Sequence, residues 1–395
     1  MNSLDLVQIL NRGCRGELSA IRSVTRLQPS GGAGDKVFPP TYEKGSYAFE
    51  QRMVEGKTVD TVLLDSVQSQ ANRFEEALLE AYRGKHLSIP VFEMAVGQHE
   101  ITSLTVPHRV HDAILRDSTW GGVPFRESEN GKRLISARAW NATAFFEYAP
   151  TALLFGTWDS QGSGGVNTAK VARSLVSEII ALDAVRGVRT SSRIDPLGIK
   201  ALQGAVVKAE NGEWTFVEPG DKKPADKKTK PVKPSEINHG NVTPTITDPA
   251  TGPGGVTFRE AIQTTVLSLT QLRKLRFPDG TASSVERDVA GRIVIAALGL
   301  LAVTLQQEEG YQLRSRCHLI PVEAPQFETI GRSEREREEF LIDSKTANDA
   351  LSVALEEATK HGLKWHGGPI ELQPRPDLLK LVQASDKAVA AGQGE

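Results

Sequence analysis

The sequence predicts an α+β fold, and three features of the chain point to that class. Val59 to Leu64 is a short run rich in β-branched residues and leucine, which is typical of a strand. The run ends at Asp65, and Ser66 then opens a helical pattern of apolar residues. A second strand-to-helix unit is expected to begin with Ala152 to Trp158. Two such units fit a split βαβ, RRM-like (ferredoxin-like) core, and periodicity alone leaves the strand order open.

The predicted helices follow from the spacing of their apolar residues. In the first helix these are Val67, Ala71, Phe74, Leu78 and Tyr82. In the second, which follows the glycine-rich Gly162 to Gly165, they are Val171, Leu175, Ile179 and Leu182. Two further helices are expected from about Ser284 to Gln307 and from about Thr346 to His361.

Two segments have the composition of insertions. Between Ser88 and Lys132, proline and glycine breaks surround a short helical stretch near His108 to Arg116, and Asn130-Gly131 predicts a turn. A short strand expected at Trp214 to Val217 leads into a stretch crowded with Pro, Gly and Lys. We therefore divide the chain into residues 1–87, 88–132, 133–213, 214–256 and 257–395.

The composition argues against wholesale disorder and against a membrane protein. Of the 395 residues, 39% are apolar and 24% are charged. The longest apolar run, Ile293 to Leu305, is shorter than the roughly 20 residues that cross a bilayer and predicts a buried core helix. The first residues lack the layout of a secretory signal, and Cys14 and Cys317 are the only cysteines. We therefore expect a cytoplasmic protein.

Signatures of catalysis are missing from the sequence. It contains no Gly-x-Ser-x-Gly elbow, no His-Glu-x-x-His, no Walker loop and no Cys-x-x-Cys. His108 and His111 stand three residues apart, but they supply two metal ligands at most. We expect neither an enzyme nor a bound metal or cofactor.

The formal net charge of -2 does not indicate a polyanionic partner, so the case for one depends on local clusters of donors. In the first cluster, the glycine-rich Gly162 to Gly165 and Asn167 lead into the predicted second helix. Glycines let backbone N–H groups approach a phosphate, and a helix N-terminus favours an anion. Lys170, Arg173 and Ser177 would share a face of that helix at i, i+3 and i+7. A tight turn remains the structural alternative.

Three other clusters carry similar donors. Ser66, Gln70 and Arg73 are spaced to share a face of the first helix, and Arg189 to Arg193 forms a loop of donors suited to phosphate oxygens. Ser235 to Asn241 could cap a turn or insert beside bases. For the first two, a solvated helix flank and surface salt bridging remain open. The candidate RNA-binding residues are Ser66, Gln70, Arg73, Gly164, Gly165, Asn167, Lys170, Arg173, Arg189, Ser191, Arg193, Asn238, His239, Arg273 and Arg276.

Several blocks in one order resemble a known family. They are Leu63 to Arg73 (LLDSVQSQANR), Ser235 to Asn241 (SEINHGN) and Leu267 to Phe277 (LSLTQLRKLRF), supported by Pro107 to Arg109, Ile114 to Ser118 and Ser191 to Leu197. Together they resemble the Cas seven-type backbone protein of CRISPR subtype I-G, formerly called I-U. The resemblance covers about Val37 to Phe277.

This resemblance implies a crRNA-binding subunit of the RAMP superfamily, in which finger-like and thumb-like elements are inserted into an RRM-like palm. By analogy, residues 88–132 would be the finger and 214–256 the thumb, and the remaining segments the palm. The implied partners are crRNA, target DNA paired to the guide, neighbouring copies in a helical filament, and the large and the foot or processing subunits of the Cascade complex.

A guide can have any sequence, so its holder must bind phosphates and sugars and leave the base edges free. Scattered polar donors suit this role, and an aromatic content of 6% does not suggest a base-stacking platform throughout the chain. Two alternatives remain open. One is a ribonuclease of the same superfamily, with His239 and Asp65 as candidate residues; the other is a phosphate-ligand metabolic enzyme built around Gly162 to Lys170.

Overall fold

The computed structural model describes residues 1–159, 170–199, 206–209, 212–218, 229–248, 250, 252–280, 282–333 and 335–390. The chain forms two compact units. The first contains Met1–Pro40, Tyr47–Ala184 and Thr257–Leu379. The second contains Thr41–Ser46, Val185–Val256 and the described part of Lys380–Glu395. We describe each unit by itself.

Several helices begin at residues whose side chains cap the first free backbone N–H groups. Ser66 accepts a hydrogen bond from the Ser69 N–H, and Ser284 accepts one from the Arg287 N–H. The α-helices are α1 (Ser3–Arg15), α2 (Val67–Arg83), α3 (Ala113–Arg116), α4 (Glu129–Ser136), α5 (Thr143–Tyr148), α6 (Thr151–Phe155), α7 (Leu269–Leu272), α8 (Val285–Glu309), α9 (Ser344–Lys360) and α10 (Pro376–Ala390). The 3-10 helices are η1 (Glu43–Gly45), η2 (Arg109–His111) and η3 (Pro234–Ile237).

The first unit is built on an antiparallel sheet with the strand order β19-β20-β1-β18-β10-β3-β2, in which β21 also pairs with β1 and with β22. Its strands are β1 (Ala20–Pro29), β2 (Phe49–Val54), β3 (Lys57–Asp65), β10 (Leu175–Leu182), β18 (Glu260–Ser268), β19 (Tyr311–Arg314), β20 (Cys317–Pro321), β21 (Phe327–Ile330) and β22 (Arg337–Phe340). Small sheets join β4 (Phe92–Val96), β5 (His99–Thr102) and β23 (Ile370–Glu371); β6 (Ser118–Trp120), β7 (Val123–Pro124) and β24 (Gln373–Pro374); and β8 (Thr157–Trp158) and β9 (Lys170–Val171). The fold is therefore a mixed α/β arrangement around an antiparallel sheet.

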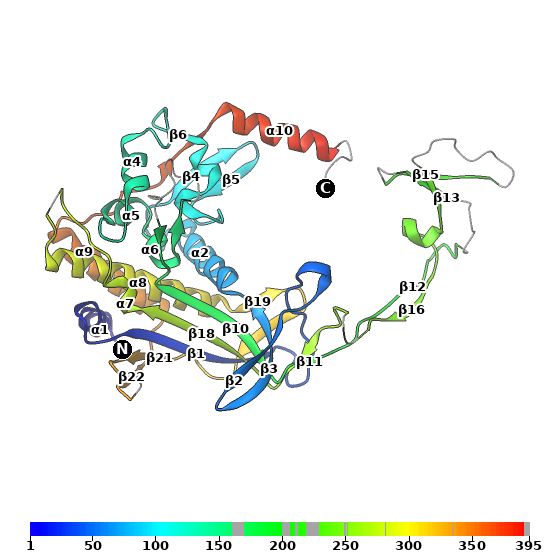
Figure 1. Cartoon of the computed structure of the whole chain (residues 1–395), viewed down its shortest axis with the longest axis horizontal. Helices are drawn as coiled ribbons and strands as arrows, with labels where there is room; N and C mark the ends of the chain where they lie inside the picture. Colours follow the sequence, from blue (N-terminus) through cyan, green and yellow to red (C-terminus); the bar gives the residue numbers. More distant parts are fainter. Residues whose placement is uncertain are drawn as a thin grey trace. The chain divides into compact units, whose positions relative to one another are not determined.

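Helices α2 and α8 lie on one side of strands β1, β18 and β10 (Figure 1). Alternate residues of β18 point toward them and are buried, as the two-residue period of a strand requires. A polar chain crosses this interface: Gln263 Nε2 donates to Gln70 Oε1 at 2.8 Å and to Gln306 Oε1 at 2.9 Å, and Tyr311 donates to Gln263 Oε1 at 2.9 Å. These hydrogen bonds satisfy amides that would otherwise be costly to bury.

Helix α8 is the central core helix, which confirms the buried helix predicted at Ile293 to Leu305. By length and composition alone α8 could cross a membrane, but 94% of its most apolar window is buried inside the protein. It packs against α1, α2 and α9. The predictions of a strand ending at Asp65, of the helix after Ser66 and of a helix over about Thr346 to His361 are likewise confirmed, by β3, α2 and α9.

The predicted second strand-to-helix unit is wrong. Ala152 to Trp158 forms α6 and the short β8, and the expected helical residues Leu175 to Leu182 form strand β10. Leu175 and Ile179 are four residues apart, a spacing that fits both a helix face and a strand face. The inward side chains between and beyond them, Ser177 and Ala181, show the two-residue period of a strand. The glycine-rich Gly162 to Gly165 lies outside the described residues.

A second correction concerns the turn predicted at Asn130-Gly131, which lies inside helix α4. Ser128 caps this helix by accepting a hydrogen bond from the Gly131 N–H at 3.0 Å. A Cβ at position 131 would lie 1.7 Å from the carbonyl oxygen of Phe125, so this glycine permits a close approach of two backbone segments. The helical stretch expected near His108 to Arg116 is present as η2 and α3.

The second unit contains an antiparallel ribbon and a three-stranded sheet. Strand β12 (Thr190–Arg193) pairs with β16 (Val242–Ile246), and β13 (Val206–Ala209) pairs with β14 (Trp214–Phe216) and β15 (Thr229–Val232). Strand β14 confirms the strand expected at Trp214 to Val217. The remaining strands are β11 (Val185–Arg186) and β17 (Val256–Thr257). Most of the segment predicted as a loop of donors, Arg189 to Arg193, is strand β12, which is a further correction.

Candidate nucleic-acid interface

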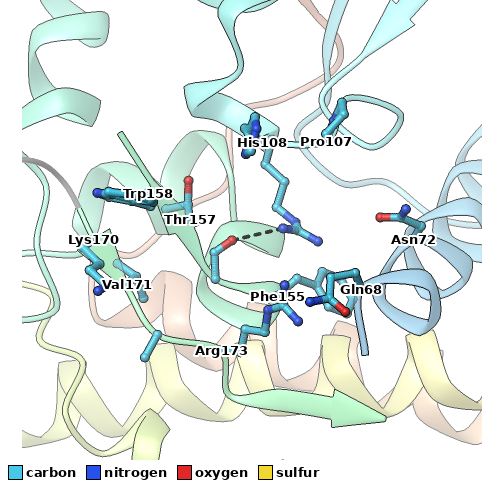
Figure 2. Close-up of a pocket in the computed structure, with 13 residues that line it drawn as sticks. Gln68, Asn72, Pro107, His108, Phe155, Thr157, Trp158, Lys170, Val171 and Arg173 are labelled. Atoms are coloured by element: carbon cyan, nitrogen blue, oxygen red, sulfur yellow. Dashed lines mark hydrogen bonds between the residues drawn. The ribbon is translucent and has the colours of Figure 1, made fainter. Parts of the chain in front are cut away.

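A cavity of about 430 Å³ opens on the first unit where four segments meet. These are the first turns of α2, the residues leading into η2, the α6–β8 junction, and β9 with the residues after it. Figure 2 shows Trp158 and Lys170 on one side of the cavity and Gln68 and Asn72 on the opposite side. The predicted residues Lys170 and Arg173 therefore come together here, although they lie on extended chain and not on a helix.

Helix α2 presents Gln68 and Asn72 to the cavity, and both are exposed. Their spacing of four residues places them on one helix face, beside the apolar face that packs on the sheet. Each amide carries a carbonyl acceptor and an NH₂ donor, so each can bind a sugar hydroxyl or a phosphate. Both residues lie in the block that carried the family resemblance, but the predicted face was a different one.

The predicted face of α2 has a structural role. Ser66 caps the helix, and Gln70 is fully buried, donating to Asp65 at 2.7 Å and accepting from Ser177 at 2.9 Å. Arg73 donates to Asp65 at 2.9 Å and to the Leu313 carbonyl oxygen at 2.6 Å. The expectation that Gln70 contacts RNA is corrected, because its side chain is enclosed by the core, as is the Ser177 side chain.

Strands β8 and β9 place an aromatic ring next to a cation. Trp158 is paired with Lys170 and Thr157 with Val171, so each pair points to one side of the ribbon. Thr157 and Val171 are buried, whereas Trp158 is 58% exposed. The Lys170 ammonium lies 5.9 Å from the centre of the Trp158 ring, within the range of a cation–π contact.

Gly156 makes room for Arg173 in the cavity. Its φ is +79°, and a Cβ there would lie 2.9 Å from Arg173 Cγ and 3.1 Å from the Val171 carbonyl oxygen. The Gly156 carbonyl oxygen accepts a hydrogen bond of 3.3 Å from Arg109, the dashed line in Figure 2. The missing side chain of Gly156 thus leaves room for Arg173, and its backbone carbonyl oxygen binds Arg109.

Positive charges outnumber negative charges among Arg109, Arg173 and Glu75, which lie at or next to the cavity. Arg109 is buried and donates two hydrogen bonds of 2.7 Å to the carboxylate of Glu75. Burial raises the pKa of Glu75 to about 7, although the positive charges of Arg109 and Arg173 act to lower it. Desolvation, followed by the charge of Arg109, lowers the pKa of Arg173. Arg109 makes the hydrogen bonds to this carboxylate, whereas Arg173 interacts with it only through charge.

Arg173 is the desolvated cation of this group. Its side chain is half-buried, and within the described ranges no hydrogen bond or ion pair is recorded for its guanidinium. Removing a charge from water without a partner is costly, so an arriving anion would be bound favourably. Lys170 adds a second positive charge at the same cavity. The arrangement suits a phosphate group.

The two histidines considered as metal ligands are separated by their environments. His108 is exposed and lines the cavity, whereas His111 Nδ1 is hydrogen-bonded to Thr157 Oγ1 at 2.8 Å. Among the described residues, no group of three or more His, Cys, Asp or Glu side chains is arranged to hold a metal ion.

His111 is expected to make the fold acid-sensitive. Burial lowers the pKa of His111 from 6.5 to about 4. The unfolded chain thus takes up this proton near pH 6.5 and the folded chain only near pH 4, so stability present above pH 6.5 is lost as the pH falls between these values. The urea midpoint should fall less steeply over this range in His111→Asn, which can keep the bond to Thr157. The exposed His99→Asn should behave like the parent protein; equal slopes in all three would contradict the assignment.

Arg273 and Arg276 hold backbone in place. Arg273 Nη1 donates to the carbonyl oxygens of Gly13 and Leu18, at 2.8 and 2.7 Å. Arg276 Nη1 donates to the Arg273 carbonyl oxygen at 3.0 Å, and its Nε lies 3.3 Å from Asp288. Arg273 therefore ties α7 to the end of α1, and Arg276 stabilises the turn after α7, roles that the sequence did not indicate.

The remaining predicted residues lie in other places. Arg189, Ser191 and Arg193 are in the second unit, as is Asn238, which follows η3 with φ +59°. His239 packs edge-on against Trp214, with 5.6 Å between ring centres. Gly164, Gly165 and Asn167 lie outside the described residues.

Comparison with known proteins links part of the chain to a CRISPR-associated family. Residues 21–186 match the family model described as CRISPR-associated protein GSU0053. This segment includes every residue that lines the cavity. It includes the Leu63 to Arg73 block but neither Ser235 to Asn241 nor Leu267 to Phe277. The match supports a CRISPR-associated protein, which is the broader part of the predicted resemblance.

Two further comparisons add no argument on function. The chain is similar to the crystal structure of Thermofilum pendens Csc2, with 12% sequence identity and a TM-score of 0.28, over 89% of this chain and 77% of that one. No curated protein sequence matches the chain.

Proposed function

We propose that this protein is a crRNA-binding backbone subunit of a type I CRISPR interference complex, of subtype I-G. The observation that carries the proposal is the half-buried Arg173, which stands with Lys170 at the cavity of the first unit. The match of residues 21–186 to a CRISPR-associated family supports the biological setting. The cations would bind guide phosphates, and Gln68 and Asn72 would bind sugar hydroxyls or phosphates beside them.

In this proposal the antiparallel sheet with α2 and α8 is the RRM-like palm. Residues 88–132 are the finger-like element, and residues 214–256, within the second unit, are the thumb-like element. Copies of the protein line up along one guide in the cytoplasm and leave its bases free to pair with target DNA. The large subunit and the foot or processing subunit complete the complex.

The ribonuclease alternative loses one of its two candidate residues. Asp65 is fully buried, and its carboxylate accepts hydrogen bonds from Ser69, Gln70, Arg73 and Arg314. A carboxylate so enclosed has no free lone pair to act on a scissile phosphate. We therefore propose binding without cleavage.

Arg173→Ala should weaken the binding of single-stranded RNA by roughly tenfold and by the same factor for all base sequences, because a phosphate contact carries no sequence information. The slope of log affinity against log salt should become shallower by about 0.7, the value of one phosphate on a single strand. The affinity and the salt slope are measured by filter binding or fluorescence anisotropy across a series of salt concentrations.

Arg332→Ala is the matched control, because Arg332 is exposed and does not line the cavity. It removes the same charge from the protein and should leave the salt slope close to that of the parent. If Arg173→Ala and Arg332→Ala gave the same curve, the cavity would not be the RNA-binding site.

A further inference from the structure

We propose that the cavity also binds one nucleobase, stacked on the exposed ring of Trp158 beside the phosphate held by Lys170 and Arg173. The inference rests on the proposed function and specifies its ligand, which is a nucleotide whose base is unstacked from its neighbours. For Lys170 and Arg173 the sequence alone suggested only contacts to the phosphate backbone.

Trp158 is presented to solvent by a fixed scaffold. Its neighbour Thr157 is 7% exposed and the cross-strand residue Val171 is 4% exposed, so the inward side of the β8–β9 pair is anchored in the core. The preceding Gly156 packs against the backbone of Arg173. The backbone that carries the ring is therefore held in position before any ligand arrives, which reduces the entropy lost on binding.

The ring and its surroundings match the two parts of a nucleotide. A base has a π-face that stacks on an aromatic side chain whatever its sequence, and a phosphate needs a cation. Here Trp158 supplies the face, and Lys170, 5.9 Å from the ring centre, and Arg173 supply the charge. Exposed tryptophans alone are ordinary. What distinguishes this one is its place at the wall of a cavity with two cations.

The opposite wall offers the polar groups that a ribonucleotide needs. Gln68 and Asn72 are exposed there, and His108 is exposed on the segment that leads into η2; all three carry groups that can bind a ribose 2′-hydroxyl or a base edge. The volume of about 430 Å³ lies within the range of sites for small ligands. Trp140, which is 70% exposed in the same unit, does not line the cavity, which makes it a natural control.

Photocrosslinking tests the stacking contact directly. Single-stranded RNAs carrying one 5-iodouridine at successive positions are bound to the full-length protein, irradiated and mapped by mass spectrometry. Crosslinks to Trp158 are expected in the parent protein and in Trp140→Leu, and are expected to vanish in Trp158→Leu. Crosslinks that avoid Trp158 at every position would overturn the inference.

Abasic RNA tests the contribution of the base. An abasic residue at the crosslinking position should weaken binding to the parent protein by roughly 5- to 150-fold, the range measured for stacked bases. In Trp158→Leu, intact and abasic RNA should bind equally. The thermal midpoint of Trp158→Leu should match that of the parent, because the ring is largely exposed.

The outcomes separate the inference from the proposed function. Arg173→Ala could weaken RNA binding while the parent protein binds abasic and intact RNA equally tightly. That result would support the phosphate site and contradict the base site. If neither Arg173→Ala nor the abasic residue has an effect, both fall. A third outcome is that a free nucleoside monophosphate raises the thermal midpoint of the parent protein but not of Trp158→Leu, while RNA gives no crosslink to Trp158. That result would show that the ligand is a small nucleotide and not a guide RNA, and it would overturn the inference.

Discussion

Asp65→Ala is expected to lower the free energy of unfolding by about 3–5 kcal/mol, the cost of removing one partner from a buried ion pair. Asp65 is fully buried at the end of β3. One carboxylate oxygen accepts from Ser69 at 2.8 Å and Arg314 at 3.1 Å, and the other from Gln70 at 2.7 Å and Arg73 at 2.9 Å. The substitution leaves two guanidinium groups without their shared counterion.

The loss should be cooperative because both arginines also hold backbone. Arg73 donates to the Leu313 carbonyl oxygen at 2.6 Å, and Arg314 donates to the Leu64 carbonyl oxygen at 2.8 Å. Strands β3 and β19 are far apart in the hydrogen-bonded order of the sheet, yet Asp65 and these arginines join them. Without the carboxylate, the two arginines lose the counterion that fixes them between β19 and the end of β3.

Urea denaturation of the full-length protein measures this effect. Asp349→Ala is the matched control, because Asp349 forms an exposed ion pair with Lys345 at 2.9 Å, and such pairs contribute at most about 1 kcal/mol. The double variant Asp65→Ala/Arg314→Met should lose less free energy of unfolding than the sum of the losses in the two single variants. The reason is that Arg314→Met removes a charge that Asp65→Ala leaves unpaired. A loss below about 1 kcal/mol for Asp65→Ala would show that the network is not a stabilising element.

Gly156→Ala is expected to damage stability and RNA binding together. The φ of +79° is disfavoured for alanine, which costs roughly 1–3 kcal/mol. The new Cβ would also lie 2.9 Å from Arg173 Cγ and 3.2 Å from Arg173 N, so the segment that carries Arg173 must move. Because Lys170 and Arg173 share that segment, RNA affinity should fall at least as much as in Arg173→Ala.

Gly122→Ala separates the two causes. Gly122 has a similar φ of +82°, but a Cβ there would have no neighbour within 4 Å. It should therefore introduce strain from a positive φ without a new steric contact, and leave RNA binding unchanged. The site as described would be wrong if Gly156→Ala, folded at the assay temperature, bound RNA like Gly122→Ala.

The elements predicted correctly from the sequence carry strong local signals. Ser66 and Ser284 mark helix starts because their hydroxyls satisfy free N–H groups within one turn. The long apolar pattern of α8 indicated a buried helix, and 94% of its most apolar window is buried inside the protein. Strand β10 was missed because Leu175 and Ile179 fit both periodicities, and the partner strands β3 and β18 that decide between them are remote in sequence.

The candidate site was only partly predictable. Lys170 and Arg173 were predicted to share a helix face; that helix does not exist, but the structure places both residues at the cavity, and their contact with RNA stays a prediction. The spacing of four residues between Gln68 and Asn72 indicated that they share a face of α2. The neighbouring face with Ser66, Gln70 and Arg73 was equally suitable for binding RNA by the same criterion. Nothing local marked Trp158, because its exposure and its position beside Lys170 follow from strand pairing.

By itself, the sequence determined the α+β class, the caps and bounds of its longest helices, and the blocks that resemble a CRISPR backbone family, since all of these depend on neighbours within a few residues. Only the tertiary structure decided which polar residues are free. Gln70 and Asp65 are enclosed in the core, whereas the half-buried Arg173 makes no hydrogen bond through its guanidinium in the described part of the chain and lines the cavity. The physical reason is that desolvation and pairing depend on segments that are distant in the chain and are brought together only by the fold.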